Sequence, residues 1–283
     1  MDFTGITLPL KFDGVKVTPW AMYGFVGRDS FENAGASGDQ KKLLQGLLPL
    51  GVSNKTLTGN SLTDRHGDAW WAGFTTELKV LDPFRFALDA TYGRVDLGEG
   101  LSTKGKKIDV KREGWIVSAL AEYKMESVTP GLTAWYSSGD DANVNNGSER
   151  LPQYNTPWAV SALGFGGGWT DIATWKVLGH NPGGLWGVVL HLKDISLMED
   201  LKHTLRAGYY HGTNNSAMPK AANMASYPSR IDGPFAYLTT SDDAWELNAD
   251  TRYKIYENLE LAVEAAYVRL NLDEGTWGKK IVN

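Results

Sequence analysis

Histidines and paired carboxylates are the residues of this chain with the clearest capacity for metal or acid–base chemistry. None of the histidines falls in a metal-ligand spacing such as H-E-x-x-H. They are His66, His180, His191, His203 and His211. Glu260 and Glu264 lie about 13 Å apart if they share a strand, too far for either carboxylate arrangement of a glycosidase. The sequence also lacks G-x-S-x-G and P-loop motifs, so it predicts no enzyme and no cofactor site.

The polar segment 137–156 contains the best candidate for a metal ion. Asp141, Asn143 and Asn145 alternate as calcium ligands do. The spacing departs from an EF-hand, because position six is Asn146 instead of Gly and position twelve is Pro152 instead of Glu. We therefore favour a tight polar loop, with a specific calcium site as the alternative.

Many of the remaining charged residues recur at every second position, opposite apolar ones. In residues 245–254, Trp, Leu, Ala, Thr and Tyr alternate with Glu, Asn, Asp, Arg and Lys. Such alternation predicts strands with one apolar and one polar face. The polar face carries too much charge for a closed core, so we expect it to line a water-filled pore. The predicted pore-lining residues are Arg85, Asp89, Glu122, Lys202, Arg206, Glu246, Asp250, Arg252, Glu260 and Glu264.

These residues are of both signs. We expect them to form opposed rows of acid and base, which would set a transverse field across the pore and filter small polar solutes by size and charge.

A Leu-Lys or Tyr-Lys pair closes a predicted strand five times along the chain. Each pair is followed by turn-forming residues such as Asp13-Gly14 or Asp82-Pro83. The lysines are Lys11, Lys79, Lys124, Lys193 and Lys254. We favour a ring of these lysines at the pore mouth over snorkelling at the membrane interface.

The recurring unit is a hairpin, and its connections alternate in length. The predicted hairpins cover residues 5–27, 68–97, 114–136, 184–212 and 243–272, which gives ten strands. Long polar connections are expected at 28–67, 98–113, 137–183, 213–243 and from Asp273 onward. Short turns at one end and long loops at the other are typical of an all-β, antiparallel up-and-down transmembrane barrel.

Aromatic residues fall at similar heights on the predicted strands, as in interfacial girdles. One predicted girdle lies toward the long loops and contains Tyr23, Tyr92, Tyr209, Tyr267, Trp70, Trp115, Trp186 and Trp245. The other contains Phe12, Phe84, Tyr123 and Tyr253. The span from Phe84 to Tyr92 is roughly 20 Å in a tilted strand, near the height of the apolar band. The alternative is that Trp and Tyr simply favour strands.

Composition is consistent with this reading. The chain has 283 residues, a net charge of −5, no cysteine and a mean hydropathy of −0.30. The net charge argues against nucleic acid as a partner, and the fold does not depend on disulfides. No apolar run reaches the ~18 residues of a membrane-spanning helix, but a barrel with a polar lumen escapes that test.

Several local features carry expectations of their own. Pro9 and Pro19 predict irregular or edge strands in the first hairpin. Asp39 is a candidate cap of a short helix, placed either inside the pore or at its rim. A parity change after Gly93 predicts a bulge there. Residues 157–183, with Gly166–Trp169, are either a loop packed in the lumen or further strands, and 213–243 reads as an external loop.

The ends of the chain suggest one β-barrel domain that is a section of a longer protein. Met1-Asp2-Phe3 lacks the features of a signal peptide, and the chain stops inside an expected loop. We therefore expect residues 1–283 to be an incomplete barrel.

Several sequence patterns resemble outer-membrane porins. They are V-T-P-W-A-M-Y-G-F-V-G-R-D from Val17, W-Y-S-S-G-D-D from Trp135, N-N-G-S-E-R-L-P from Asn145, A-E-Y-K from Ala121 and R-Y-K-I from Arg252. The likeness is greatest to the homotrimeric porins of sulfate-reducing, Desulfovibrio-type bacteria. It implies a sixteen-stranded trimeric barrel in the outer membrane of a Gram-negative cell, in contact with lipid and passing ions and small hydrophilic solutes.

A different class stays open: a soluble or surface-attached β-sandwich that binds carbohydrate through exposed Trp and Tyr. Partitioning into detergent and conductance in a planar bilayer separate the two. A third possibility, a barrel enzyme, lacks a visible nucleophile–base pair.

Overall fold

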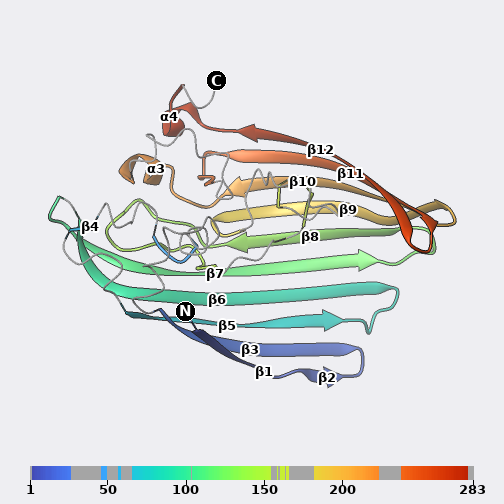
Figure 1. The fold of residues 1–283 in the computed structure, drawn as a ribbon, viewed down its shortest axis with the longest axis horizontal. Coiled ribbons are helices and arrows are strands. Elements are labelled where there is room, and N and C mark those ends of the chain that lie inside the picture. Colours follow the sequence, from blue (N-terminus) through green and yellow to red (C-terminus); the bar gives the residue numbers. More distant parts are fainter. Residues whose placement is uncertain are drawn as a thin grey trace.

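A computed structural model describes residues 2–26, 46–49, 57–58, 66–102, 104–153, 158, 160–162, 164–165, 182–222 and 237–279. They form one antiparallel sheet of 12 strands (Figure 1). Ten strands neighbour one another in sequence order: β1 (Asp2–Thr7), β3 (Val15–Val26), β5 (Gly67–Leu78), β6 (Phe84–Ser102), β7 (Lys107–Tyr123), β8 (Thr129–Ser137), β9 (Leu185–Met198), β10 (Leu201–Gly212), β11 (Asp243–Tyr256) and β12 (Leu259–Asn271). Up-and-down order and the ten-strand prediction are thus confirmed. Within the described residues β1 and β12 do not pair, so the sheet is open.

Two short strands lie off this path. β2 (Leu10–Phe12) continues the line of β1, since both pair with β3. The gap between β1 and β2 contains Pro9, as the sequence predicted, and the Leu8 amide donates to the carbonyl of Pro19. β4 (Leu57–Thr58) pairs with the end of β6.

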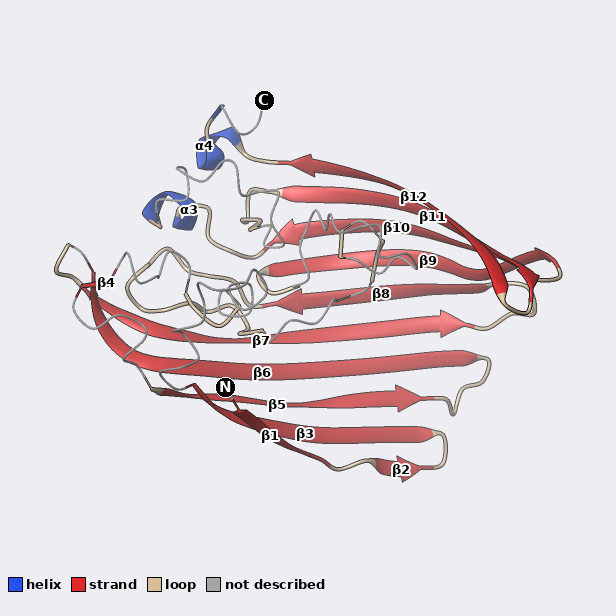
Figure 2. Cartoon of the chain, in the orientation of Figure 1, coloured by secondary structure: helices blue, strands red, loops and turns tan. Residues whose placement is uncertain are grey.

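The connections differ in length at the two ends of the sheet. In Figure 2 the short turns all lie at one end of the sheet, and the strand ends that lead into the long connections lie at the opposite end. One expected loop is wrong: residues 98–113 mostly extend the hairpin of β6 and β7. Ile108 and Val110 alternate there with charged residues, which sustains strand pairing. Beyond Asp273 a short helix, α4 (Glu274–Trp277), begins where a loop was expected.

The two faces of the sheet differ in chemistry. We call the outer face the one that carries Tyr23, Leu88 and Leu247, and the inner face the one that carries Trp71 and Glu122. Cross-strand register places these residues consistently on opposite sides of the sheet. Large apolar side chains on the outer face are exposed, and no described residues cover them.

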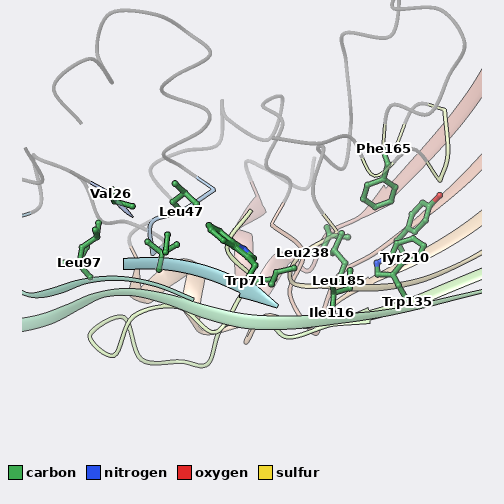
Figure 3. Packing of buried hydrophobic residues seen from close by; sticks show 14 of the residues in the cluster. Val26, Leu47, Trp71, Leu97, Ile116, Trp135, Phe165, Leu185, Tyr210 and Leu238 are labelled. Atoms are coloured by element: carbon green, nitrogen blue, oxygen red, sulfur yellow. The ribbon is translucent and has the colours of Figure 1, made fainter. Parts of the chain in front are cut away.

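Apolar side chains on the inner face are instead buried, and they belong to the half of the sheet near the long connections. Figure 3 shows Trp71, Trp135 and Tyr210 of the strands with Leu47 and Phe165 of the connections. This packing explains the parity change after Gly93. The register runs through Gly93 without interruption, so the predicted bulge is wrong, and the shift lies between Asp96 and Glu99.

Val95 and Leu97 face inward because connecting segments cover them there. Gly93 itself faces inward beneath the ring of Trp71, where a Cβ would collide with the indole. The parity change in the sequence therefore indicates that the inner face is covered there, and it does not indicate a backbone irregularity at Gly93.

The described helices are short. α3 (Met218–Ala221) contacts α4, and the side chain of Asp273 caps α4 by accepting from the Thr276 amide at 2.7 Å. Hydrogen bonds from Thr276 hold the pKa of Asp273 below its usual value. Among the described residues, no helix has the length and apolar character needed to cross a membrane.

Candidate functional site

The predicted pore-lining residues share the inner face. Register pairs Arg85 with Glu122, Arg206 with Asn248, and Asp250 with Glu264, and strand alternation places all ten on this side. Their burial ranges from complete to half-exposed: Glu246 and Asp250 are each 1% exposed, whereas Glu260 is an exposed residue. The structure thus brings them onto one wall, although their role as pore lining stays a prediction.

A cluster centred on Glu122 spans this wall near the short turns. One carboxylate oxygen accepts from Arg85 Nη1 at 2.8 Å. The other lies 2.9 Å from Lys193 Nζ and 3.2 Å from His191 Nε2. Arg85 also donates to Glu77 at 2.8 Å. Glu122 thus links side chains of β5, β6 and β7 with those of β9. The link passes over β8, which lies between β7 and β9 in the sheet.

Gly131 of β8 makes the contact across that strand possible. It lies directly between Glu122 and His191 in the register, on the inner face. A Cβ at this position would meet both the His191 ring and Cγ of Glu122. Glycine leaves the space in which the two long side chains meet. Sequence reasoning missed Gly131, His191 and Glu77, because their importance depends on register between strands.

We expect Gly131→Val to destabilise the protein by about 1–3 kcal/mol, the usual cost of overpacking a tight site. The branched side chain would separate His191 from Glu122 and leave a buried carboxylate with fewer partners. The measurement is urea unfolding in detergent. Thr133→Val, at the next inner position of β8, is the matched control. Equal stabilities of the two variants would contradict the role given to Gly131.

Other charges on the wall also pair with neighbours. Arg206 donates to Asp250, and Arg252 lies 2.9 Å from Glu260. These contacts do not test the expected arrangement of opposed acidic and basic rows, which stays a prediction. These pairs are diagonal: Asp250 and Glu260 each lie two residues from the position directly opposite the arginine on the adjoining strand.

The described residues of 160–165, which are 160–162 and 164–165, are docked on the inner face of β11. The Gly164 amide donates to Glu246 at 3.1 Å, and the Ala162 amide donates to Asn248 at 3.0 Å. Tyr210 donates to the second oxygen of Glu246 at 3.1 Å. Of the two readings for 157–183, its described residues follow the packed loop, and Gly166–Trp169 lies outside the described residues.

The aromatic contacts reinforce this docking. The Phe165 ring is edge-on to Tyr210 and to Trp135, with centroids 5.1 and 5.5 Å apart. Trp158 lies 5.8 Å from Trp135. The segment therefore combines ring packing with hydrogen bonds to a buried carboxylate.

Two further inward segments are held by buried side chains of the sheet. Trp71 Nε1 donates to the carbonyl of Pro152 at 2.8 Å. Arg112, which is 3% exposed, donates to the Leu151 carbonyl at 2.9 Å and lies 3.5 Å from that of Leu48. Leu47 is buried in the same cluster, so residues 46–49 lie on the inner face. The helix proposed at Asp39 falls outside the described residues.

In the connection 213–243, the described residues 237–239 are less external than expected. Tyr237, Leu238 and Thr239 are buried, and Leu238 packs in the main apolar cluster. Tyr237 donates to Asp140 at 2.8 Å, and burial together with Asp140 raises the pKa of Tyr237 well above its usual value. This hydroxyl therefore stays neutral, and its bond to Asp140 joins two connections of the sheet. A second bond joins the same connections, because the Asn214 side chain accepts from the Asp140 amide.

The calcium candidates are engaged in hydrogen bonds within their own loop. Asp141 accepts from the Asn143 amide at 2.6 Å, and Asn143 accepts from the Asn145 amide at 3.0 Å. Within the described ranges no group of three or more His, Cys, Asp or Glu has an arrangement fit for a metal ion. These bonds favour the tight polar loop.

The predicted mouth lysines lie at the short-turn end of the strands. Backbone amides of Lys79, Lys124 and Lys254 donate to turns of the neighbouring strands, at Gly14, Pro83 and Asp200. Lys193 points to Glu122, whereas Lys11 is opposite Lys16 in the register of β2 and β3. A ring at a pore mouth is not tested by these contacts.

The predicted girdle residues lie on the outer face. The rings of Trp186, Tyr209 and Trp245 form a continuous row, with centroids 5.5 and 4.7 Å apart. On β5 and β6, Trp70 lies 5.1 Å from Tyr92. Tyr23 and Tyr267 are exposed residues of the same face, and Trp115 stacks on Tyr136. Phe84 and Tyr123 meet 4.7 Å apart near the short turns. Phe12 and Tyr253 share the outer face in the register of their strands.

Neither a protein-family model nor a curated protein matches this chain. Its fold is similar to that of solved outer-membrane channels. OccAB3 of Acinetobacter baumannii is 13% identical, with a TM-score of 0.40, over 94% of this chain and 61% of that one. OccK3 of Pseudomonas aeruginosa is 11% identical, with a TM-score of 0.33, over 96% and 65%. The outer membrane channel DcaP of Acinetobacter baumannii is 13% identical, with a TM-score of 0.32, over 95% and 79%. This chain therefore spans less than two thirds of the length of OccAB3 and OccK3.

Proposed function

We propose that this chain forms part of the wall of an outer-membrane porin, through which ions and small hydrophilic solutes diffuse. The inner face would line the aqueous conduit, and the outer face would contact lipid. The mature channel would be a closed barrel that includes strands beyond those described here, because both sheet edges are open.

The observation that carries this proposal is the reversed polarity of the sheet. Leu247 and Val263 on the outer face are 59% and 54% exposed, whereas Glu246 and Asp250 on the inner face are each 1% exposed. A water-soluble protein gains stability by the opposite arrangement. Exposed leucine and valine flanked by rows of aromatic rings match a lipid-facing band, for which a bilayer is the fitting solvent.

The alternative carbohydrate-binding sandwich requires a second layer over the apolar face. No described residues pack there, and Leu205 and Leu261, which such a sandwich would seal, are 44% and 53% exposed. Aromatic rings also run in a row across neighbouring strands, as Trp186, Tyr209 and Trp245 do, unlike the single concave patch that would suit a sugar. The polarity of the faces therefore favours the channel.

The inward segments would narrow the proposed channel in its half near the long connections. Residues 46–49 and 160–165 pack on the inner face beside Trp71 and Tyr210. We infer that solutes are selected there by size. We assign no enzymatic role to the wall, because Glu122 and Asp250 are engaged by cationic side chains and Glu246 by amides and a hydroxyl.

Finer features stay proposals. The resemblance to Desulfovibrio-type porins supports a sixteen-stranded homotrimer in the outer membrane of a Gram-negative bacterium. In that assembly the mouth lysines would ring the pore, and the two aromatic girdles would lie at the membrane interfaces. Cross-linking in mild detergent, with a trimer as the expected product, tests the oligomeric state.

The decisive experiment is reconstitution of the purified protein into a planar lipid bilayer. We expect discrete, ohmic conductance steps and passage of small sugars into liposomes, with exclusion of large dextrans. A protein that stays soluble without detergent and produces no steps would contradict the proposal. A heat-unfolded sample controls for conductance caused by detergent.

A further inference from the structure

Charged side chains on the inner face are mostly neutralised by a neighbour. Arg85 is shared between Glu77 and Glu122, and the Arg206 side chain is paired with Asp250. Opposite charges in contact produce little net field at the distance of a passing ion. These pairs therefore contribute to the wall's stability more than to its preference for one sign of charge.

Asp89 of β6 differs from these residues. Its side chain lies on the inner face and the residue is exposed. Within the described part of the chain, no ion pair or hydrogen bond engages its carboxylate. It therefore presents an unneutralised negative charge to the space in front of the wall.

The surroundings of Asp89 are hydroxyl-rich. Thr75 of β5 and Ser118 of β7 lie directly opposite it in the two neighbouring ladders, and Thr18 of β3 follows in the same row. Hydroxyl groups can accept from an ammonium group or coordinate an alkali ion alongside the carboxylate. The row offers no described cation that would compete, and Arg85 is about 13 Å away along the strand.

Asp89 also lies outside the part of the inner face that the connecting segments cover. On the side of β5 the buried cluster begins at Trp71, which is opposite Gly93, two inner positions farther toward the long connections. On the side of β7 it reaches the row of Asp89 itself, where Ser118 is buried and Trp135 follows it, whereas Asp89 and Thr75 are exposed. An ion moving through the proposed conduit would therefore meet this carboxylate directly next to the narrowed half. Low-dielectric walls strengthen the effect of a charge at such a place.

We propose that Asp89, with the hydroxyls of Thr75 and Ser118, forms a site for small monovalent cations and makes the channel cation-selective. This inference rests on the proposed function and names the solute class that its wall favours. It predicts that removal of one carboxylate changes selectivity without closing the conduit.

The test is the reversal potential in a planar bilayer with a potassium chloride gradient. We expect the wild-type protein to pass potassium over chloride, and Asp89→Asn to lower that permeability ratio severalfold toward unity. Asp89→Glu should restore the preference, because it keeps the charge in the same row. Glu126→Gln removes the same charge at an exposed turn and should leave the ratio unchanged.

The outcomes separate the two proposals. If the wild-type protein conducts but Asp89→Asn retains its permeability ratio, the cation site is wrong and the porin proposal stands. If the wild-type protein forms no channels, the proposed function and this inference both fall. A fall of the ratio for Glu126→Gln equal to that for Asp89→Asn would also overturn the site, because net charge alone would then explain selectivity.

Discussion

An arginine at Leu88 is expected to destabilise the membrane-inserted protein by about 2–4 kcal/mol, the cost of such a charge at the bilayer midplane. Leu88 lies on the outer face of a central strand, midway between the ring of Phe84 and that of Tyr92. Each of these rings is about 13 Å away along the strand, so the guanidinium would have a long way to reach headgroups. Thr76 and Ala119, its cross-strand neighbours, offer no acidic partner.

Ala87→Arg provides a control that differs by one position in the chain. Ala87 lies on the inner face, directly opposite Glu77, so the new charge would meet water and a carboxylate. We expect the stability of this variant to stay within about 1 kcal/mol of the wild type, as for an exposed ion pair. The comparison tests the assignment of the faces, because the side chain and the strand are the same.

Equilibrium unfolding by guanidinium chloride in phospholipid vesicles measures both free energies. Heat-modifiable mobility in gel electrophoresis reports whether each variant reaches the folded state. Equal losses in the two variants would refute the lipid-facing assignment of Leu88. A larger loss for Ala87→Arg would reverse the faces and favour a soluble protein.

The sequence predicted the two faces well because each depends on a local pattern. In β11, Trp245, Leu247 and Ala249 alternate with the polar residues of the other face, and this alternation runs to Lys254. Antiparallel pairing then places Glu260 and Glu264 of β12 on the polar face of β11. Turn residues such as Asp13-Gly14 located the hairpin ends. One polar residue on the outer face, His203, is satisfied by Thr251 directly opposite, at 2.9 Å.

Features that depend on long-range contacts could not be predicted in the same way. The apolar residues Val95 and Leu97 face inward because Leu47 and Leu151, distant in sequence, cover that side. A single strand gives no information on such a cover, so its parity change alone predicts a bulge. The pairing of Arg85 with Glu122 likewise depends on register between two strands.

The extension of β6 and β7 was, by contrast, available in the sequence. Ile108 and Val110 alternate with Lys107, Asp109 and Lys111, which is a strand pattern. The abundance of Gly and Lys at 98–107 suggested a loop and outweighed it. Composition favours loops wherever a hairpin projects into water, although backbone pairing continues there.

Replacement of Glu246 by alanine is expected to release residues 160–165 from the wall and to increase single-channel conductance. Glu246 accepts from the Gly164 amide, the Tyr210 hydroxyl and, at 2.7 Å, the Asn248 amide. Each donor left buried without a partner costs about 1–3 kcal/mol. Undocking of the segment would let water satisfy these donors, and it would widen the narrowed half of the conduit.

The absence of cysteine allows a direct measurement of that release. Ser161 is 1% exposed in the docked segment, so a single Ser161→Cys substitution should react slowly with a water-soluble maleimide. In the Glu246→Ala background we expect the same thiol to react at least about tenfold faster, because about 1.4 kcal/mol of lost docking free energy gives that factor. Glu246→Gln, which keeps a carbonyl acceptor for the Gly164 amide, should stay close to the slow rate.

Conductance and labelling should change together, since both depend on whether the segment occupies the conduit. Fast labelling with unchanged conductance would show that residues 160–165 do not narrow the pore, and equal labelling rates would remove Glu246 as their anchor. The heat-modifiable gel shift confirms that the variant is folded in either case. The buried carboxylate of Glu246 would thus hold the segment through a backbone amide. Because its negative charge is directed to these donors, it need not affect a passing ion. The carboxylate of Asp89 is exposed and can act on that ion directly.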